Sequence, residues 1–159
     1  MSSKIHPSFK CGVNFKIGEF CIIEEGVIVG DNVTIENYVL LKTGTIVGNN
    51  VFIDSYVRSS GNCRIGDDVT LRYGVTVAKA VTIDNGAFIS PNVMTIYSTH
   101  KKENKPGTYI GKNAHIGTAA VLGPNVKIAD NVVVGALAFV SKNCLEEGIY
   151  VGVPAKRMK

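Results

Sequence analysis

The chain of 159 residues contains no tryptophan and only five prolines, and it has no long apolar run. No stretch approaches the ~18 apolar residues that a membrane-spanning helix needs. The N-terminal MSSKIHPS also lacks the apolar core of a secretory signal. We therefore expect a cytoplasmic protein without a membrane partner. The net charge of +4 is mild and no basic stripe is interleaved with aromatics, which argues against nucleic-acid binding.

What the sequence does contain is a six-residue repeat. From Ile5 it divides into sixteen consecutive blocks that end at His100, and six further blocks start at Ile110. The first position is Ile, Leu or Val in nineteen of these twenty-two blocks, and the fourth is Asn, Gly or Asp in fourteen. The latter residues tolerate the left-handed backbone of a sharp turn. Each block therefore predicts a short strand and a turn, with the first and fifth side chains inward.

One block cannot bury its apolar face, but stacked blocks form one continuous core. Three blocks per coil predict an all-β, parallel β-helix, a triangular prism of about seven coils. We expect a single domain over residues 1–159, with the β-helix at 5–145 and a C-terminal tail at 146–159. Four cysteines fall on first or fifth positions and have no CxxC spacing, so we expect inward-facing apolar plugs. They are Cys11, Cys21, Cys63 and Cys144.

The repeat fails at one place, directly after His100. Residues 101–109 are too polar to add a strand in register, and Pro106-Gly107 predicts a turn. We therefore expect an excluded loop over 101–109, and such interruptions usually serve function. The basic residues at 101–105 and 155–159 fit either a solvated surface or a site for phosphate groups.

The pattern [LIV]-[GAED]-x-x-[STAV]-x, from about Ile5 to Lys159, resembles the hexapeptide-repeat acyltransferases, which fold as left-handed parallel β-helices. The left hand comes from this resemblance alone, because the general rule for parallel crossovers favours the right hand. From ISPNVMTIYSTH onward the chain is similar to the C-terminal half of the galactoside, maltose and related sugar acetyltransferases. The opening IHPS resembles the start of several nucleotide-amino-sugar N-acetyltransferases.

This resemblance implies transfer of an acetyl group from acetyl-CoA to a hydroxyl or amine of a sugar or nucleotide-sugar, without a metal. The histidine that ends the matching stretch is the family's catalytic base, and it maps onto His100. Imidazole suits this role because its reference pKa of ~6.5 lies near working pH. His100 holds the sixth position of its block, which faces outward. The family also implies a homotrimer with active sites between subunits, walled by the loop of a neighbour.

The resemblance assigns the cofactor contacts as well. Thr118 and Ala136 are expected to touch the pantetheine arm, although the turns alone could demand small residues there. Ser141 and Lys142 are expected near the adenosine diphosphate end, and Lys156 and Arg157 at the phosphates, where cationic donors bind strongly. His115 either lines the cofactor groove or is simply exposed, and His6 receives no role.

The sequence departs from the galactoside and maltose enzymes at residues 71–80, LRYGVTVAKA. Those enzymes carry Asn and Asp near this place to bind the acceptor sugar, and they precede the repeat with a helical region. This chain has Arg72 and Lys79 instead. The two cations favour an anionic acceptor such as a nucleotide-linked sugar.

Other functions fit the residues less well. Serine O-acetyltransferases add an N-terminal helical domain for which there is no room, although a non-sugar acceptor stays open. A γ-type carbonic anhydrase needs three imidazoles, two of them in H-x-x-x-x-H spacing, whereas His100 and His115 are fifteen residues apart. A non-catalytic structural or binding solenoid is the remaining alternative, and it would have no use for the loop or His100.

Overall fold

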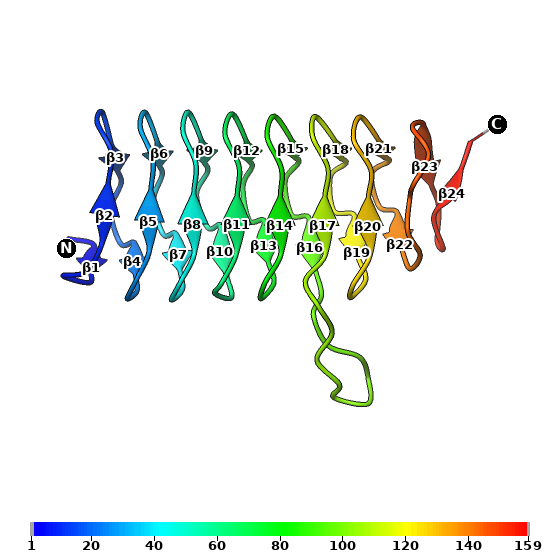
Figure 1. Ribbon diagram of the computed structural model, residues 1–159, viewed down its shortest axis with the longest axis horizontal. Coiled ribbons are helices and arrows are strands. Elements are labelled where there is room, and N and C mark those ends of the chain that lie inside the picture. Colours follow the sequence, from blue (N-terminus) through cyan, green and yellow to red (C-terminus); the bar gives the residue numbers. More distant parts are fainter. Residues whose placement is uncertain (1, 159) are drawn as a thin grey trace.

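The computed structural model describes residues 2–158, and it consists of three β-sheets wound into a solenoid. The coils stack along one axis, with the two chain ends at opposite ends of the prism (Figure 1). Strands from successive coils pair in parallel, for example Ile22 with Leu40, so that one coil takes 18 residues. The expected all-β, left-handed parallel β-helix is thereby confirmed, with about eight turns instead of about seven.

All strands but β23 have two residues. Sheet A contains β1 (Lys4–Ile5), β4 (Ile22–Ile23), β7 (Leu40–Leu41), β10 (Arg58–Ser59), β13 (Thr76–Val77), β16 (Met94–Thr95), β19 (Val121–Leu122) and β22 (Phe139–Val140). Sheet B contains β2 (Lys10–Cys11), β5 (Ile28–Val29), β8 (Ile46–Val47), β11 (Arg64–Ile65), β14 (Thr82–Ile83), β17 (Tyr109–Ile110) and β20 (Lys127–Ile128). Sheet C contains β3 (Lys16–Ile17), β6 (Thr34–Ile35), β9 (Phe52–Ile53), β12 (Thr70–Leu71), β15 (Phe88–Ile89), β18 (His115–Ile116), β21 (Val133–Val134), β23 (Ile149–Val151) and β24 (Lys156–Arg157).

Three corners join the sheets, and each is named here by the two sheets that it connects. The A–B corner follows the strands of sheet A, the B–C corner follows the strands of sheet B, and the C–A corner follows the strands of sheet C up to β21. The fourth residue of most blocks has a positive φ, for example 55° at Asn32 and 71° at Gly44. The predicted left-handed turn residue is therefore confirmed.

The core consists of the first and fifth residues of the blocks, such as Ile23 and Val27, which are 2 % and 0 % exposed. Cys21, Cys63 and Cys144 belong to this core, as predicted. Burial raises the pKa of the Cys144 thiol to about 11, so this thiol stays protonated at neutral pH.

The prediction for Cys11 is wrong, because this residue is exposed. It lies in β2, in the first coil of the described prism, where the inward positions are covered from one side only. Phe9 and Phe15, the fifth residues of the first two blocks, partly cover this end, with ring centroids 5.2 Å apart.

Two polar residues at first positions, Ser59 and Thr95, have a specific reason to be inside. The Ser59 hydroxyl accepts the Lys42 backbone N–H at 3.0 Å, and the Thr95 hydroxyl accepts that of Ala78 at 2.6 Å. In other coils such a backbone N–H donates to a carbonyl of the next coil, as Glu24 N–H does to the Leu41 carbonyl. At Lys42 and Ala78 the side-chain hydroxyl takes the place of that carbonyl as the acceptor. These two polar first positions therefore have a structural role, and Thr95 directly precedes the irregular segment.

The C-terminal end is closed by β24, which pairs antiparallel with β23. Arg157 donates to the Glu147 carbonyl at 2.6 and 3.1 Å and pairs with the Glu146 carboxylate at 3.2 Å. Residues 2–158 contain no helix that is long and apolar enough to cross a membrane.

Candidate functional site

The irregular segment is a hairpin over residues 96–108, inserted at the A–B corner between β16 and β17. It projects from the otherwise even prism (Figure 1). Its arms meet through an antiparallel bridge between Ser98 and Asn104, and the Thr99 N–H donates to the Glu103 carbonyl at 3.0 Å. The Lys102 N–H donates to the Thr99 carbonyl at 2.9 Å and closes a turn at the tip.

Three contacts fix the base of this hairpin to the prism. Tyr97 packs against the core, and its carbonyl accepts the Lys105 N–H at 2.8 Å. The buried Thr108 hydroxyl donates to the Gly123 carbonyl at 3.1 Å. Gly107 lies so close to the Ala80 carbonyl that a β-carbon would overlap it. A residue without a side chain is therefore required where the return arm crosses the preceding coil.

His100 is exposed and lies in the turn at the tip of the hairpin. The sequence predicted that it ends the sixteenth block on an outward position of the prism. This prediction of its position is wrong, because the chain leaves sheet A after Thr95 and does not follow the outline of the prism from there to His100. The segment outside the sheets accordingly begins at Ile96 and ends before Tyr109, which belongs to β17.

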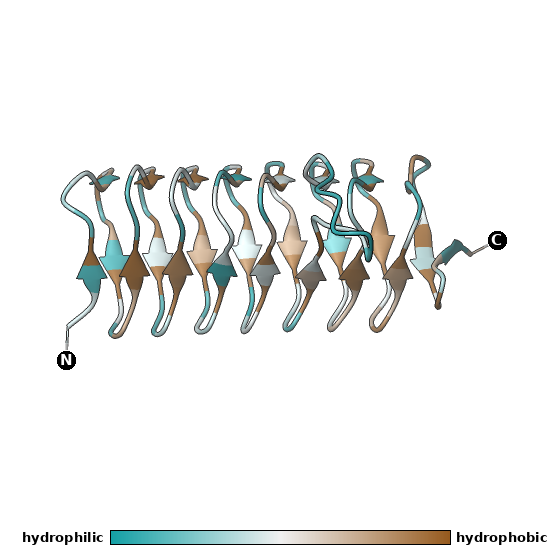
Figure 2. Cartoon of the chain, turned by 90° about the horizontal axis from the view of Figure 1, so that it is seen from below, coloured by the Kyte–Doolittle hydropathy of each residue, from teal (hydrophilic) through white to brown (hydrophobic). Residues whose placement is uncertain are grey.

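The hairpin is strongly polar (Figure 2) and carries three lysines and one glutamate. Lys105 pairs with Glu103 at 2.9 Å. Lys101 and Lys102 are exposed at the tip next to His100. The imidazole therefore stands in a cationic environment that solvent reaches freely.

The residues assigned to the pantetheine arm share one corner. Thr118 and Ala136 lie on successive coils of the C–A corner, and both are exposed. The Leu137 N–H donates to the Thr118 carbonyl at 2.9 Å, which holds the two coils together. Small side chains on adjacent coils leave the backbone of this corner accessible, which fits an extended ligand that binds amides.

The remaining cofactor residues lie elsewhere. Ser141 and Lys142 are exposed at the A–B corner, and Lys156 is exposed on β24. Arg157 is engaged with Glu146 and Glu147 of its own chain. Within one chain, sheet A separates His100, Ser141 and Lys142 from Thr118 and Ala136. The predicted site is therefore divided between two corners of the prism.

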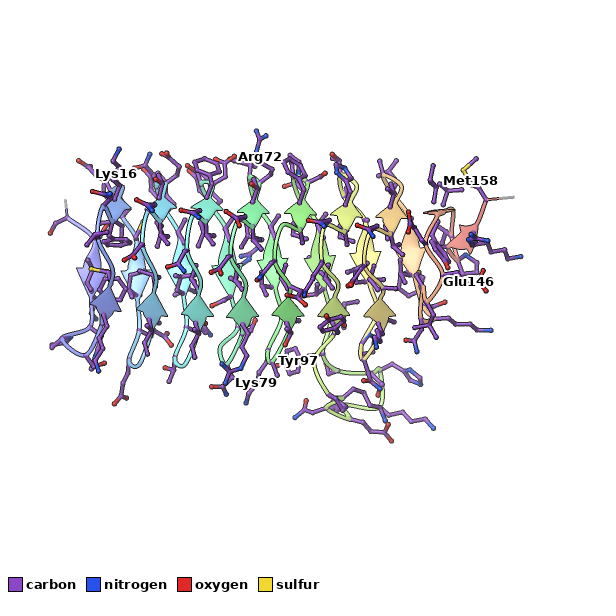
Figure 3. The ribbon with its side chains drawn as sticks, turned by 45° about the horizontal axis from the view of Figure 1, so that its top comes forward. Lys16, Arg72, Lys79, Tyr97, Glu146 and Met158 are labelled. Atoms are coloured by element: carbon purple, nitrogen blue, oxygen red, sulfur yellow. The ribbon has the colours of Figure 1, made fainter. Side chains whose placement is uncertain are left out.

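The two residues assigned to the acceptor are not neighbours either. Arg72 lies at the C–A corner and Lys79 at the A–B corner, on opposite edges of the prism (Figure 3). Arg72 pairs with Asp54 at 3.2 Å, so part of its charge is already compensated. Lys79 is exposed one coil before the hairpin, near its base.

His115 is exposed on the outer face of sheet C. Its ring stacks on Phe88 with centroids 5.2 Å apart, and its Nε2 lies 3.4 Å from the hydroxyl of the buried Ser90. His115 and His100 thus belong to different parts of the fold. Among residues 2–158, no cluster of three or more His, Cys, Asp or Glu side chains is arranged to hold a metal ion.

A row of exposed aromatic rings lies along the C–A corner and was not predicted from the sequence. Phe20, Tyr38 and Tyr56 stack with centroid distances of 4.9 Å, and Tyr73 follows at 5.3 Å. The first three have φ values of 58–64°, which are strained for large side chains. The spacing of 18 residues between Phe20, Tyr38 and Tyr56 was the signal that could have revealed the row, since one coil takes 18 residues.

Beside the return arm of the hairpin, the Tyr109 hydroxyl donates to Asp84 at 2.8 Å. This hydrogen bond is the main reason that the pKa of Tyr109 rises to about 12. The pKa of Asp84 is lowered, first by the Asn85 N–H and then by the Tyr109 hydroxyl. The pair ties β17 to β14 immediately after the hairpin.

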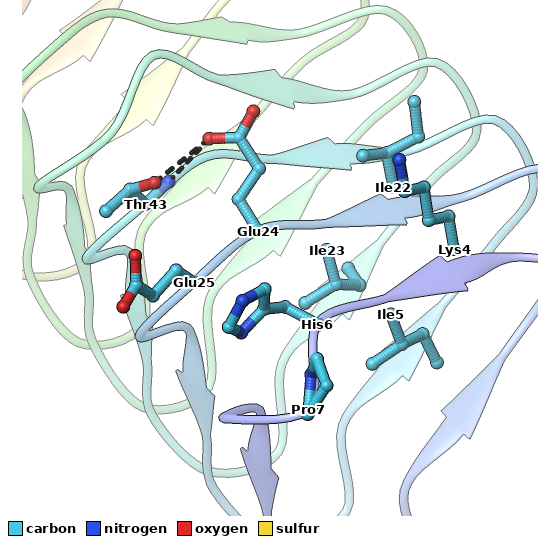
Figure 4. Close-up of a pocket in the computed structure, with 9 residues that line it drawn as sticks. All are labelled: Lys4, Ile5, His6, Pro7, Ile22, Ile23, Glu24, Glu25 and Thr43. Atoms are coloured by element: carbon cyan, nitrogen blue, oxygen red, sulfur yellow. Dashed lines mark hydrogen bonds between the residues drawn. The ribbon is translucent and has the colours of Figure 1, made fainter.

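A shallow hollow of about 410 Å³ lies at the N-terminal end of the A–B corner (Figure 4). It is lined by Lys4, Ile5, His6, Pro7, Ile22, Ile23, Glu24, Glu25 and Thr43. Glu24 accepts the Thr43 N–H and hydroxyl at 3.0 and 3.1 Å, and His6 Nδ1 lies 2.8 Å from the Ser8 hydroxyl. None of the predicted site residues lines this hollow.

The sequence matches two protein families, both of them hexapeptide repeats. "Bacterial transferase hexapeptide (six repeats)" matches residues 44–79 and 107–142, and "Hexapeptide repeat of succinyl-transferase" matches residues 12–43. Together these matches span more than half of the chain, and they omit the greater part of the hairpin.

The chain is also similar to known proteins in sequence and in structure. Galactoside O-acetyltransferase of Escherichia coli (strain K12) is 32 % identical over 106 residues, which cover 60 % of this chain and 52 % of the relative. A structure of galactoside acetyltransferase in complex with coenzyme A has a TM-score of 0.66 and 29 % identity, over 74 % of this chain and 64 % of that chain. A perosamine N-acetyltransferase variant from Caulobacter crescentus, in complex with CoA and GDP-perosamine, has a TM-score of 0.62 and 20 % identity, over 98 % and 55 %.

The chain spans about half the length of this galactoside O-acetyltransferase. The likeness to the perosamine enzyme, at 20 % identity, supports the fold alone. The repeat, the prism and the family matches agree with one another, and the chain belongs to the hexapeptide-repeat family of bacterial transferases.

Proposed function

We propose that this protein is an acetyltransferase that uses acetyl-CoA and acts on a hydroxyl or amine of a sugar or nucleotide-sugar. The observation that carries the proposal is the hairpin, which is the one long interruption of the described prism and presents His100 at its tip. The relatives named above as acetyltransferases, one of them solved with coenzyme A, support this donor.

In this mechanism His100 is the general base. Its neutral imidazole accepts the proton of the acceptor's hydroxyl or amine while the oxygen or nitrogen attacks the thioester carbonyl. The carbon–sulfur bond then breaks, and the imidazolium returns the proton to the departing thiolate. Thr118 and Ala136 are exposed, and their own backbone N–H groups would serve the pantetheine amides and the developing oxyanion.

We further propose that the active form is a homotrimer, because one chain does not bring the site residues together. The A–B corner of one subunit, with His100, would meet the C–A corner of the next, with Thr118 and Ala136. Contacts between two different surfaces close into a ring when the rotation fits. The outer face of sheet A supports this arrangement, since Ile22 and Met94 are 45 % and 44 % exposed on it.

The aromatic row extends this apolar surface along the C–A corner. Tyrosine is enriched in protein interfaces. Aromatic residues are also unusual at these exposed turn positions, where most other blocks have Asn, Asp or Gly. We assign Phe20, Tyr38 and Tyr56 to the contact between subunits. A monomeric mass by light scattering at micromolar concentration would contradict the shared site.

The test of the proposed function has two stages. Acetyl-CoA at a hundred times its Kd should raise the folded stability by roughly 2.7 kcal/mol, with adenosine 3′,5′-bisphosphate as the control ligand. His100→Ala should then lower kcat by about 10²–10⁴-fold and leave acetyl-CoA affinity unchanged, measured by thiol release with a panel of sugars and nucleotide-sugars. His6→Ala, an exposed histidine at the other end of the prism, is the matched control and should retain full activity.

Absence of any stabilisation at millimolar acetyl-CoA would instead favour a non-catalytic binding solenoid. Equal rates for wild type and His100→Ala would reject His100 as the base and leave the donor assignment intact.

A further inference from the structure

The hairpin tip carries positively charged side chains that form no ion pair with the described residues. His100, Lys101 and Lys102 follow one another in the turn, and all three are exposed. Lys105, on the return arm, is paired with Glu103. Among residues 2–158, no carboxylate lies within ion-pair distance of Lys101 or Lys102. Two uncompensated ammonium groups therefore stand beside the imidazole.

The backbone gives no reason for a lysine at this place. Lys102 has a φ of 60°, which glycine or asparagine adopts more easily than lysine. Its N–H closes the turn with Thr99, and any residue except proline could make that bond. The Lys102 side chain makes no described contact that stabilises the hairpin. Its charge is therefore a candidate for a role toward a ligand.

We propose that Lys101 and Lys102 bind the phosphate groups of the acceptor, and that the acceptor is a nucleoside-diphosphate-linked sugar. This inference rests on the proposed function and narrows its substrate class. Ammonium groups bind phosphate oxygens as strong charge-assisted donors, whereas a neutral sugar has no use for two unpaired cations.

The position of the lysines distinguishes the acceptor from the donor. The thioester must reach His100, and the phosphates of coenzyme A lie at the opposite end of the long pantetheine arm. In a nucleotide-linked sugar, the diphosphate is one sugar ring away from the hydroxyl or amine that reacts. Lysines directly after the base therefore suit the acceptor's diphosphate.

The tip is also a better phosphate site than Arg72, one of the two residues that the sequence predicted for an anionic acceptor. Arg72 is compensated by Asp54 at 3.2 Å and lies at the other corner. Lys79, exposed near the base of the hairpin, could extend the cationic path toward the prism. The acceptor would then follow the hairpin from tip to base.

The experiment measures the Kd values of UDP, dTDP and GDP, of uridine as the phosphate-free probe, and of acetyl-CoA by isothermal titration calorimetry. The variant is Lys101→Gln/Lys102→Gly, in which glycine keeps the positive φ of the turn. Lys112→Gln, an exposed lysine at the B–C corner, is the matched control for charge. We expect at least one diphosphate to bind and uridine not to bind, a loss of tenfold or more in diphosphate affinity for the double variant only, and unchanged acetyl-CoA affinity.

Three outcomes would overturn the inference. Diphosphate affinity that is equal in wild type and double variant would remove the lysines from the site. A loss of acetyl-CoA affinity in the double variant would assign them to the coenzyme's phosphates. Binding of acetyl-CoA without binding of any nucleoside diphosphate would reject this acceptor class and leave the proposed function standing, whereas absence of acetyl-CoA binding would reject the proposed function itself.

Discussion

Two neighbouring segments of the A–B corner, residues 78–81 and 96–108, connect a strand of sheet A to a strand of sheet B in different ways. At 78–81 the chain turns tightly, Ala78 and Val81 are buried, and the backbone N–H groups of Ala78 and Ala80 bond to the adjacent coils. At 96–108 the arms bond mainly to each other. The prism is stabilised by repetition, and the hairpin departs from it at little cost because it satisfies its own polar groups.

The largest effect on stability is expected inside the prism. Leu71→Ala, at a fully buried position, should lower the free energy of unfolding by about 2–5 kcal/mol. Lys101→Ala at the hairpin tip should change it by less than about 0.5 kcal/mol. Urea unfolding at one fixed protein concentration measures both. Comparable losses would mean that the hairpin is part of the cooperative core.

The base of the hairpin should lie between these extremes. Gly107→Ala introduces a β-carbon that overlaps the Ala80 carbonyl, so we expect a loss of about 1–3 kcal/mol and at least a tenfold fall in kcat/KM. Gly26→Ala is the control, since its β-carbon would meet only the Gly44 backbone nitrogen, at an ordinary contact distance of 3.9 Å, and its φ of 68° is what opposes the change. If both variants keep wild-type activity, the return arm does not position His100.

A smaller effect than at Gly107 is expected at the hydrogen bond that follows the hairpin, between Tyr109 and Asp84. Tyr109→Phe removes the hydrogen bond to Asp84 and should cost about 1 kcal/mol near neutral pH. Because the pKa of Tyr109 is raised to about 12 in the folded state, this contribution is present below pH ~10 and is lost as the pH rises from ~10 to about 12.

The same difference should also fade in acid. The pKa of Asp84 is lowered on folding, so its contribution is present above ~3.9 and is lost as the pH falls through the folded pKa. Unfolding curves of wild type and variant from pH 2 to 12 test both limbs. A difference that is independent of pH would assign the effect to packing of the ring.

The pattern of apolar and turn residues was sufficient to predict the prism. Each block repeats the same order of inward apolar residues and turn residues, and stacking such blocks buries all the apolar faces in one core. It was sufficient, too, for the inward Cys21, Cys63 and Cys144. It failed for Cys11, which is exposed in the terminal coil of the described prism. It also did not indicate why Ser59 and Thr95 are inside, because the backbone donors that they satisfy lie one coil away.

For the candidate site, the sequence by itself identified the interruption and the histidine next to it. Only the tertiary structure decided that the chain leaves the sheet at Ile96, that His100 lies at the tip of a hairpin, and that Thr118 and Ala136 lie across sheet A from it. A six-residue period determines which side of a strand each residue faces, and that is local information. Which corner a residue occupies depends on its place within the 18-residue coil and on the insertions that come before it. The bounds and the path of an insertion are set by its contacts with neighbouring coils.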